Sequence, residues 1–379
     1  MFPKIHTKEL TSSLVWFFNP GYEASLSGVT ANYTPPRSVC RFRRDLATLP
    51  IYMTSGCDYV MVADDMPEQY RTSQIISELS GDDALQPWGW ASELKSYLPK
   101  GYVLPFTVDE MRALGSRHQS LSLWREIVRI EPALFSHLME PMECSAMPNS
   151  LPLHRAWVLK DEYSSSGRGV RFFSDEVGLG DFFASVSKSR SKRYYIEPYY
   201  EIVEDRGYEF YMSATGEVRY LGGSEFVTEK GKYIANRLQP ADQLETKWQA
   251  TPTTPSHENY ILLLSRALSR LSLYGYSGPI GVDTAVVANE EGALELLPCI
   301  EVNIRPTMGH LALALSERDL PSEHGKGYFQ ITTLTPAQRA DWLNVAPLYM
   351  ESTSLLARGV YPLTPVTEET RFVATLTIE

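Results

Sequence analysis

The chain has 379 residues, of which 43% are hydrophobic and 21% charged, so it is long enough for two or three globular domains. Its formal net charge is -11, and no run of lysine or arginine stands out. A nucleic acid or an anionic membrane surface is therefore not expected as the main partner, because either needs a basic patch.

The cysteines and the N-terminal segment indicate where the protein works. The four cysteines are far apart in sequence and show no CxxC spacing: Cys40, Cys57, Cys144 and Cys299. This pattern indicates a reducing compartment. The apolar run Leu14–Phe18 is too short for a signal peptide or a membrane span. We therefore expect a cytoplasmic protein.

The first third of the chain alternates strand-like and helix-like segments. "SSLVWFF" and "DYVMVADD" predict buried strands, and the residues after "YTPPRS" predict a helix between them. "QPWGWASELKSYL" and "TVDEMRALGSRHQSLSLWREIVRI" continue the alternation, which is typical of a parallel α/β domain over about the first 110 residues. Ligands of such sheets bind at the carboxyl ends of the strands. The loop Asn19–Glu23 is thus a candidate substrate loop, with Arg37 as a carboxylate-binding residue, although a plain surface turn explains the same sequence.

The second half of the chain has a different pattern, in which strands and hairpin turns are more frequent than helices. "RAWVLKDEYSSSGRGVRFF" predicts strand, loop and strand, and residues 192–235 predict antiparallel strands with hairpin turns at "ATGE" and "EKGK". Ser256 is expected to cap a helix. "GPIGVDTAVV" and "LELLPCIEVNIRP" predict two strands that pair through the turn "NEEGA". The segment from Gly325 onward has strand-like runs but no motif.

One predicted strand carries polar side chains along one face. Because side chains alternate on a strand, one face holds Ile300, Val302 and Ile304, and the other holds Glu301, Asn303 and Arg305. Asp283 on the preceding strand can face the same volume as Glu301. Mg²⁺ prefers oxygen ligands, takes one or two carboxylates and completes its shell with substrate phosphates. The alternative is a half-exposed strand whose polar side chains are solvated.

The loop after Lys160 has the composition of a phosphate site. "SSSGRG" supplies hydroxyl groups, two glycines and Arg168, and glycine lets backbone N–H groups approach phosphate oxygens. The order differs from a P-loop, because the lysine precedes the glycines. A flexible hairpin loop is the alternative.

The stretch "RYYIEPYYEIVEDRGYEFY" can present backbone groups to a purine. Tyr194–Pro198 predicts a strand that ends at a proline, as an interdomain hinge does. Glu197 and Glu204 are spaced to reach an amino group or ribose hydroxyls. The tyrosines themselves favour a packed core.

Taken in this order, these segments resemble the ATP-grasp superfamily, and most of all its carboxylate–amine ligase branch, from near Arg117 to Leu315. The resemblance implies a mixed fold of the α/β and α+β classes. It implies a parallel α/β pre-ATP-grasp domain over residues 1–112, then a small lobe with a Gly-rich flap over 113–195. A C-terminal lobe with antiparallel sheets and the metal site follows over 196–379.

The resemblance also implies a role for each matching residue. The predicted catalytic residues are Arg305, Lys160 and Arg168, and the predicted magnesium ligands are Asp283, Glu301 and Asn303. The predicted nucleotide-binding residues are Lys160, Ser164, Ser165, Ser166, Gly167, Gly169, Glu197, Tyr199, Glu204 and Arg117. Asp161 and Glu162 depart from this pattern, because carboxylates beside phosphates cost electrostatic energy unless they face away.

The implied activity is an ATP- and Mg²⁺-dependent ligation of a carboxylate to an amine or a thiol through an acylphosphate, with release of ADP and phosphate. Small-molecule or peptide substrates are expected, and homodimers are common in the family. The alternatives are a nucleotide-binding regulatory protein without turnover and a phosphotransferase acting on an alcohol. No histidine pair has zinc-hydrolase spacing. We expect His310 to be a satisfied histidine at the start of a helix whose N-terminus points at the nucleotide.

Overall fold

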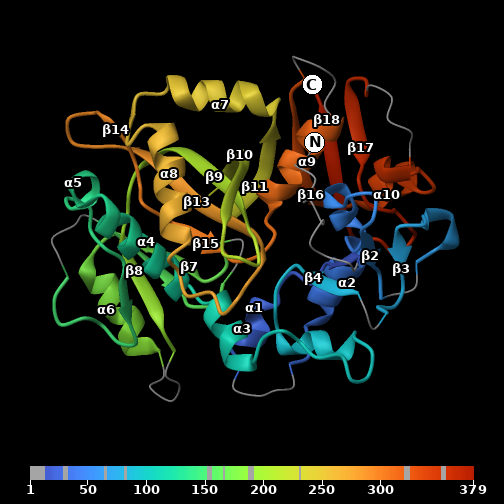
Figure 1. Ribbon diagram of the computed structural model, residues 1–379, viewed down its shortest axis with the longest axis horizontal. Helices are drawn as coiled ribbons and strands as arrows, with labels where there is room; N and C mark the ends of the chain where they lie inside the picture. The colour runs from blue at the N-terminus through green and yellow to red at the C-terminus, as the bar shows by residue number, and fades with distance from the viewer. Residues whose placement is uncertain are drawn as a thin grey trace.

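The computed structural model describes residues 13–28, 33–63, 66–80, 83–151, 156–164, 167–186, 192–229, 232–319, 325–350 and 356–379. Within these residues the strands form three sheets, one parallel and two largely antiparallel (Figure 1). The mixed fold class expected from the sequence is therefore confirmed. The domain boundaries at residues 112 and 195 stay predictions.

The N-terminal sheet is parallel throughout, as predicted. Its strand order is β3 (Ile75–Ile76), β2 (Tyr59–Met61), β1 (Leu14–Phe17) and β4 (Ala84–Pro87). The central strand is apolar because both of its faces are covered, as is usual for parallel sheets. Its helices are α1 (Glu23–Leu26), α2 (Arg37–Asp45) and α3 (Val108–Gly115), with 3₁₀ turns at Leu49–Met53, Glu68–Tyr70 and Ser92–Ser96.

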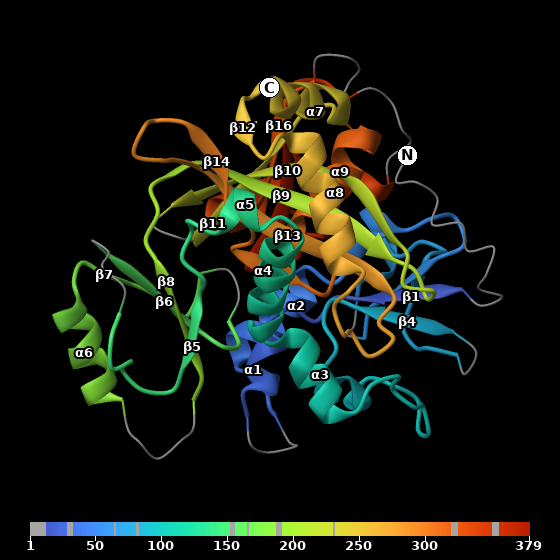
Figure 2. The ribbon, with the colours of Figure 1, turned by 60° about the vertical axis from the view of Figure 1, so that its left-hand side comes forward.

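A small antiparallel sheet follows, in the order β5 (Met142–Cys144), β8 (Tyr194–Pro198), β6 (Trp157–Asp161) and β7 (Val170–Phe173). On one face, Trp157, Leu159 and Ile196 are buried against helix α6 (Glu176–Ser185). Figure 2 shows this sheet and α6 standing apart from the larger sheet. By alternation, Val158 and Lys160 point away from α6, toward the larger sheet.

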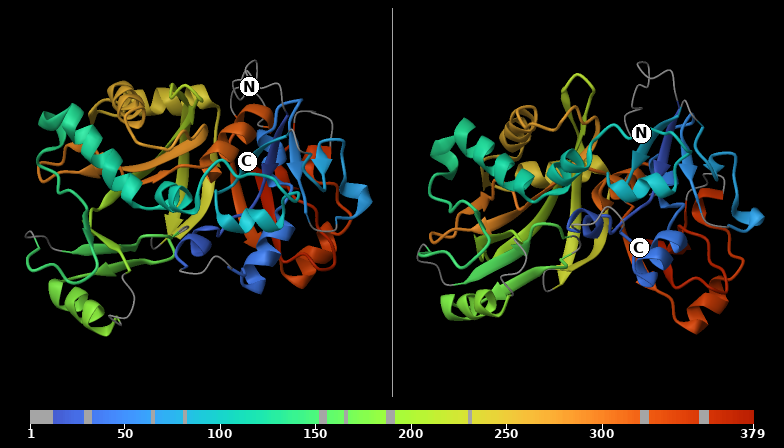
Figure 3. Two further views of the ribbon diagram at one scale, coloured as in Figure 1. Left: turned by 60° about the horizontal axis from the view of Figure 1, so that its bottom comes forward. Right: turned by 90° about the horizontal axis from the view of Figure 1, so that it is seen from below.

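The largest sheet has ten strands. Its order is β12 (Thr253–Thr254), β14 (Leu294–Leu296), β13 (Gly278–Ala288), β9 (Ile202–Met212), β10 (Val218–Glu229), β11 (Lys232–Leu238), β16 (Gly327–Thr333), β18 (Phe372–Ile378) and β17 (Gly359–Pro362), and β15 (Glu301–Asn303) also pairs with β13. The C-terminal segment, which carried no readable motif, thus supplies three strands. Figure 3 shows it beside the N-terminal sheet, and Trp16 and Leu376 belong to one buried cluster.

Helices cover both faces of the large sheet. Helix α9 (Met308–Asp319) packs on β10 where Gly222 faces Leu313, and α7 (Ala241–Ala250) packs on the opposite face, where Gly223 faces Trp248. Helix α8 (His257–Leu268) packs beside α7, α4 (His118–Ile130) packs on α8, and α5 (Pro132–Phe135) packs on α4. The C-terminal part holds α10 (Pro336–Trp342) and a 3₁₀ turn at Leu348–Met350. The predicted cap is confirmed, because Ser256 accepts a hydrogen bond from the Asn259 N–H.

Two remaining features concern the helices and the cysteines. In the described part of the chain, none of the helices combines the length and the apolar character that a bilayer crossing requires. All four cysteines are free thiols.

Packing of α7 on β10 depends on the absence of a side chain at Gly223, because a Cβ there would lie 2.2 Å from the Trp248 ring. We expect G223A to lower the free energy of unfolding by about 1–3 kcal/mol, the usual cost of overpacking. The matched change G180A, inside α6 with nothing within 4 Å, should raise it by about 0.5–1 kcal/mol. Urea unfolding measures both, and equal effects would contradict this packing.

Candidate active site

A cavity of about 520 Å³ lies between the small sheet, the large sheet and the loop that follows β1. This volume is in the range of small-molecule and cofactor sites. Ten acidic or basic side chains line it: Glu23, Arg117, Lys160, Arg168, Glu197, Asp205, Glu209, Asp283, Glu301 and Arg305. Such a density of opposite charges in one hollow points to a charged ligand.

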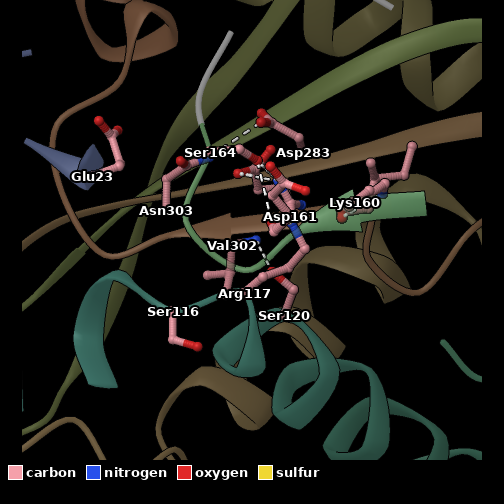
Figure 4. A network of polar contacts seen from close by, with 12 residues as sticks. Glu23, Ser116, Arg117, Ser120, Lys160, Asp161, Ser164, Asp283, Val302 and Asn303 are labelled. Atoms are coloured by element: carbon pink, nitrogen blue, oxygen red, sulfur yellow. Dashed lines mark hydrogen bonds and ion pairs between the residues drawn. The ribbon is translucent and has the colours of Figure 1, made fainter. Parts of the chain in front are cut away.

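Two carboxylates meet in this cavity because of strand register. Strands β13 and β15 pair antiparallel, with Asp283 directly opposite Glu301 and Gly281 opposite Asn303. Side chains at directly opposed positions point to the same face of a sheet. Asn303 Nδ2 donates to Asp283 Oδ2 at 3.2 Å, one of the contacts drawn in Figure 4. The phase predicted for this strand is confirmed, since Glu301, Asn303 and Arg305 all line the cavity.

The electrostatics of this pair suit a divalent cation. Burial raises the pKa of Asp283 well above its ordinary value, and the neighbouring charges of Glu301 and Glu209 raise it further. No cluster of three or more histidine, cysteine or acidic side chains able to hold a metal occurs among the described residues. Two carboxylates with one amide oxygen suit Mg²⁺, which keeps positions for phosphate oxygens, better than zinc, which prefers nitrogen and sulfur ligands.

Two buried cations of the cavity are paired with carboxylates. Lys160 Nζ lies 2.6 Å from Glu197 Oε2 and also donates to the Ile300 carbonyl. Arg117 Nη2 lies 3.2 Å from Glu301 Oε1, and Arg117 Nη1 is buried without a hydrogen-bond partner among the described residues. A buried donor without a partner carries a desolvation penalty that a ligand oxygen would relieve.

The flap prediction is met in part. Gly167 and Gly169 have φ angles of +73° and +78°, which favour glycine, and Gly167 and the exposed Arg168 line the cavity. Gly169 instead lies against Asp161, where a Cβ would be 2.8 Å from its carboxylate. Ser164 lines a side chamber and accepts a hydrogen bond from Arg117. Ser165 and Ser166 lie outside the described residues.

The two acidic residues after Lys160 have partners of their own, so they do not add unpaired negative charge beside the proposed phosphate site. The Asp161 carboxylate binds Arg171 at 2.8 Å and Lys192 at 3.0 Å. Glu162 accepts a hydrogen bond from Ser116 and pairs with Arg193. Each carboxylate thus has its own cation or donor, which answers the electrostatic objection raised by the sequence.

The hinge lies beside an apolar slot. The slot is lined by Val158, Val170, Phe172, Pro198, Tyr199, Leu297 and Ile300. Phe172 and Tyr199 meet edge to face at 5.9 Å. The Tyr199 N–H donates to the Ala156 carbonyl, so this amide is already used within the protein. A flat aromatic ligand fits such a slot.

Glu204 does not reach the cavity, contrary to the sequence prediction. Its carboxylate binds Arg206 at 2.7 Å and Lys247 at 2.6 Å. The next residue, Asp205, lines the cavity and accepts a hydrogen bond from Thr228. Neighbouring residues of a strand face opposite sides, so a shift of one position exchanges the two carboxylates.

Sequence reasoning missed Glu209, a fully buried carboxylate in the cavity wall. It accepts hydrogen bonds from Ser224 at 2.9 Å and Thr307 at 2.8 Å and lies 2.8 Å from His310 Nδ1. His310 is a satisfied histidine at the start of α9, as predicted. A Cβ at Gly309 would lie 1.8 Å from Glu209 Oε1, so the protein's own carboxylate occupies the helix N-terminus expected to face the nucleotide.

The predicted substrate loop lies at the cavity, but Arg37 does not. Pro20, Gly21 and Glu23 line the cavity, whereas Arg37 is exposed on α2 and is absent from its wall. Arg37 is therefore a wrong prediction. It begins α2 with an exposed side chain, whereas Val39 in the same turn lies against Gly21, so the helix meets the loop through an apolar residue.

No protein-family model and no curated protein sequence match the chain. Among solved structures, an ADP complex of N5-carboxyaminoimidazole ribonucleotide synthetase is 10% identical, with a TM-score of 0.49 and 97% and 92% of the two chains covered. The Staphylococcus aureus N5-carboxyaminoimidazole synthetase is 11% identical, with a TM-score of 0.48 and coverages of 97% and 93%. The Campylobacter jejuni biotin carboxylase in complex with a β,γ-ATP ligand is 12% identical, with a TM-score of 0.42 and coverages of 79% and 71%.

These solved structures belong to the ATP-grasp carboxylate–amine ligases, the branch that the sequence resembles. TM-scores under 0.5 are too low to assign an activity to this chain.

Removing one charge of the acidic pair should stabilise the protein without ligand. D283N removes the cost of burying a charge at this position and the repulsion of that charge by Glu301 and Glu209, so we expect its free energy of unfolding at neutral pH to exceed that of the wild type by about 1–3 kcal/mol. The folded-state pKa of Asp283 is raised, so the difference should disappear as the pH falls below the unfolded-state pKa, where both states are protonated. Urea unfolding at several pH values measures it, and a less stable D283N at neutral pH would contradict the electrostatic account.

Proposed function

We propose that this chain is an ATP-grasp carboxylate–amine ligase, which joins a carboxylate to an amine and converts ATP to ADP and phosphate. The observation that carries the proposal is the pair Asp283 and Glu301, fixed face to face by β13 and β15 inside a cavity of nucleotide size. Two half-buried carboxylates on the same face of a sheet repel each other, and a cation between them would relieve this repulsion. A purely structural cavity has no need of such a pair.

Residues along the cavity suit successive parts of a nucleotide. The apolar slot at Phe172 and Tyr199 suits the purine, and Asp205 takes the place that the sequence gave to Glu204 beside the ribose. Lys160 and Arg168 suit the phosphates. Asp283, Glu301 and the amide oxygen of Asn303 suit Mg²⁺, which when bound neutralises and aligns the phosphates.

The proposed chemistry needs positioning and charge compensation and no nucleophile from the protein. A carboxylate oxygen of the substrate attacks the γ-phosphorus, and the bond to the bridging oxygen breaks with its electrons leaving on ADP. The amine nitrogen then attacks the carbonyl carbon of the acylphosphate, the C–O bond breaks, phosphate departs, and the nitrogen loses a proton to solvent. Arg305 and Arg117 face the region where negative charge develops, in a buried site where such contacts are strong.

The ion pairs among residues of the cavity also support the proposed function. Lys160 is held by Glu197 and Arg117 by Glu301, so these two buried cations are paired before ligands bind. A cation that joined Glu301 would free Arg117 for a phosphoryl oxygen. Binding of the ligands would thus replace the ion pair between Arg117 and Glu301 with contacts of each residue to the ligands.

A screen for ADP release tests the proposal. Wild-type protein, ATP and Mg²⁺ are combined with pooled carboxylates and amines, and products are identified by mass spectrometry. An amide with ADP and phosphate is the expected result. A phosphoester with ADP would indicate a phosphotransferase instead, and the absence of ADP with every pool would contradict an enzymatic role.

The Glu301→Ala variant should lose Mg²⁺-dependent ADP formation by about a hundredfold or more, the usual scale when electrostatic stabilisation of a transition state is removed. Glu295→Ala is a matched control, because Glu295 lies in the same sheet and binds His137 and Asn289 outside the cavity. A cooperative unfolding transition confirms that each variant folds. Normal turnover by Glu301→Ala would remove the metal assignment.

Lys160→Ala should weaken ATP binding about tenfold or more, because a charge-assisted contact to a phosphate is lost. Calorimetric titration with a non-hydrolysable ATP analogue measures the dissociation constant. Lys247→Ala is the control, since Lys247 pairs with Glu204 and Glu225 away from the cavity. Equal affinities of wild type and Lys160→Ala would argue against the assigned role.

A further inference from the structure

The loop between β1 and α1 is held in one conformation by contacts with neighbouring segments. Asn19 Nδ2 donates to the Gly89 carbonyl at 2.8 Å, and the Gly89 N–H donates to Asn19 Oδ1 at 3.0 Å. Arg43 Nε donates to the Pro20 carbonyl at 2.9 Å. A Cβ at Gly89 would lie 2.0 Å from the Tyr22 ring, so the ring packs directly on this glycine. The loop therefore holds the residue that follows it, Glu23 at the start of α1, in a fixed position at the cavity.

Glu23 is a buried residue, and one of its carboxylate oxygens has no hydrogen-bond partner among the described residues. Its residue exposure is 6%, and its Oε1 lies 3.7 Å from Arg305 Nη2. Its Oε2 is buried and has no hydrogen-bond partner among the described residues. A buried carboxylate oxygen without a partner is costly, and native proteins rarely keep one without a reason.

Glu23 lines both the main cavity and a side chamber of about 20 Å³ that adjoins it. The chamber has room for about one polar group of the size of a water molecule. Arg117, whose Nη1 is also without a partner, and Glu301 line the same chamber. Figure 4 shows Glu23 on a different element from Arg117, on the side of the N-terminal sheet.

The charge around Glu23 is not balanced by Arg305. Burial raises the pKa of Glu23, and although Arg305 lowers it, the net shift is upward. The same guanidinium also faces Glu301 and Asp283, so its charge is shared among three carboxylates. A further cation beside Glu23 would complete the set.

We propose that Glu23 binds the ammonium group of the amine substrate and so makes the ligase select cationic amines; this rests on the proposed function. The carboxylate recognises the positive charge and holds the nitrogen at the N-terminal wall of the cavity, beside Arg305, and the ammonium group releases one proton to solvent before its nitrogen attacks the acylphosphate. The protein thereby separates two tasks. The metal ligands serve the carboxylate half-reaction, and the loop after β1 serves the amine half-reaction.

A competing explanation is that Glu23 only orients Arg305, with water in the chamber. Hydroxylamine separates the two explanations, because it traps acylphosphates as hydroxamates and is largely uncharged at neutral pH. If Glu23 acts through Arg305, its loss slows the carboxylate half-reaction with every nucleophile. If Glu23 binds an ammonium group, its loss affects charged amines alone.

The experiment compares wild type, E23Q and E225Q with a panel of carboxylic acids, ATP and Mg²⁺, first with hydroxylamine and then with a panel of primary amines. E225Q is the matched control, because Glu225 is a buried glutamate paired with Arg237 and lies outside the cavity. We expect E23Q to raise KM for primary amines about tenfold or more, the scale of a charge-assisted contact, while hydroxamate formation stays within about twofold of wild type. E23D should retain part of the amine affinity, and thermal unfolding verifies that all variants fold.

The outcomes distinguish this inference from the proposed function. Equal losses with hydroxylamine and with amines would overturn the role of Glu23 while leaving the ligase intact. An unchanged KM for amines in E23Q would overturn it as well. If wild type makes neither hydroxamate nor ADP with any carboxylate, the proposed function fails, and the role of Glu23 fails with it.

Discussion

The register between β13 and β15 is the constraint on which the rest of the site depends. It places Asp283 opposite Glu301 on one face of a sheet whose other face is packed core. A slip of β15 by one residue would send Glu301 into that core and separate it from Asp283. The glycine opposite Asn303, Gly281, keeps space for Thr307 and Glu209, so backbone pairing and the cavity wall are built together.

Holding these carboxylates together lowers the stability of the protein without ligand. The fold limits that loss by pairing several charged residues of the cavity. Lys160 pairs with Glu197, Arg117 with Glu301, and Glu209 is surrounded by hydroxyl donors and His310. Two buried atoms without a hydrogen-bond partner among the described residues, Glu23 Oε2 and Arg117 Nη1, belong to residues that line the side chamber. The side chamber therefore offers one acceptor and one donor to a ligand.

The features of the site that depend only on the local alternation of side chains could be predicted from the sequence. Strict alternation correctly placed Glu301, Asn303 and Arg305 on one face of their strand, and Asp283 was predicted on the strand that precedes them. The same reasoning failed at Glu204, because strand phase near the hinge depends on pairing with β13 and β10, which the local sequence does not contain. Glu209 and the role of the C-terminal strands were missed because both depend on contacts between segments distant in sequence.

A structure of the protein with manganese and ADP, with the metal located by anomalous scattering, tests the central claim most directly. Our account expects one manganese ion between the carboxylates of Asp283 and Glu301, a purine against Phe172 and Tyr199, and Arg117 displaced from Glu301. Manganese bound elsewhere, or a nucleotide bound outside this cavity while Arg117 still holds Glu301, would contradict it.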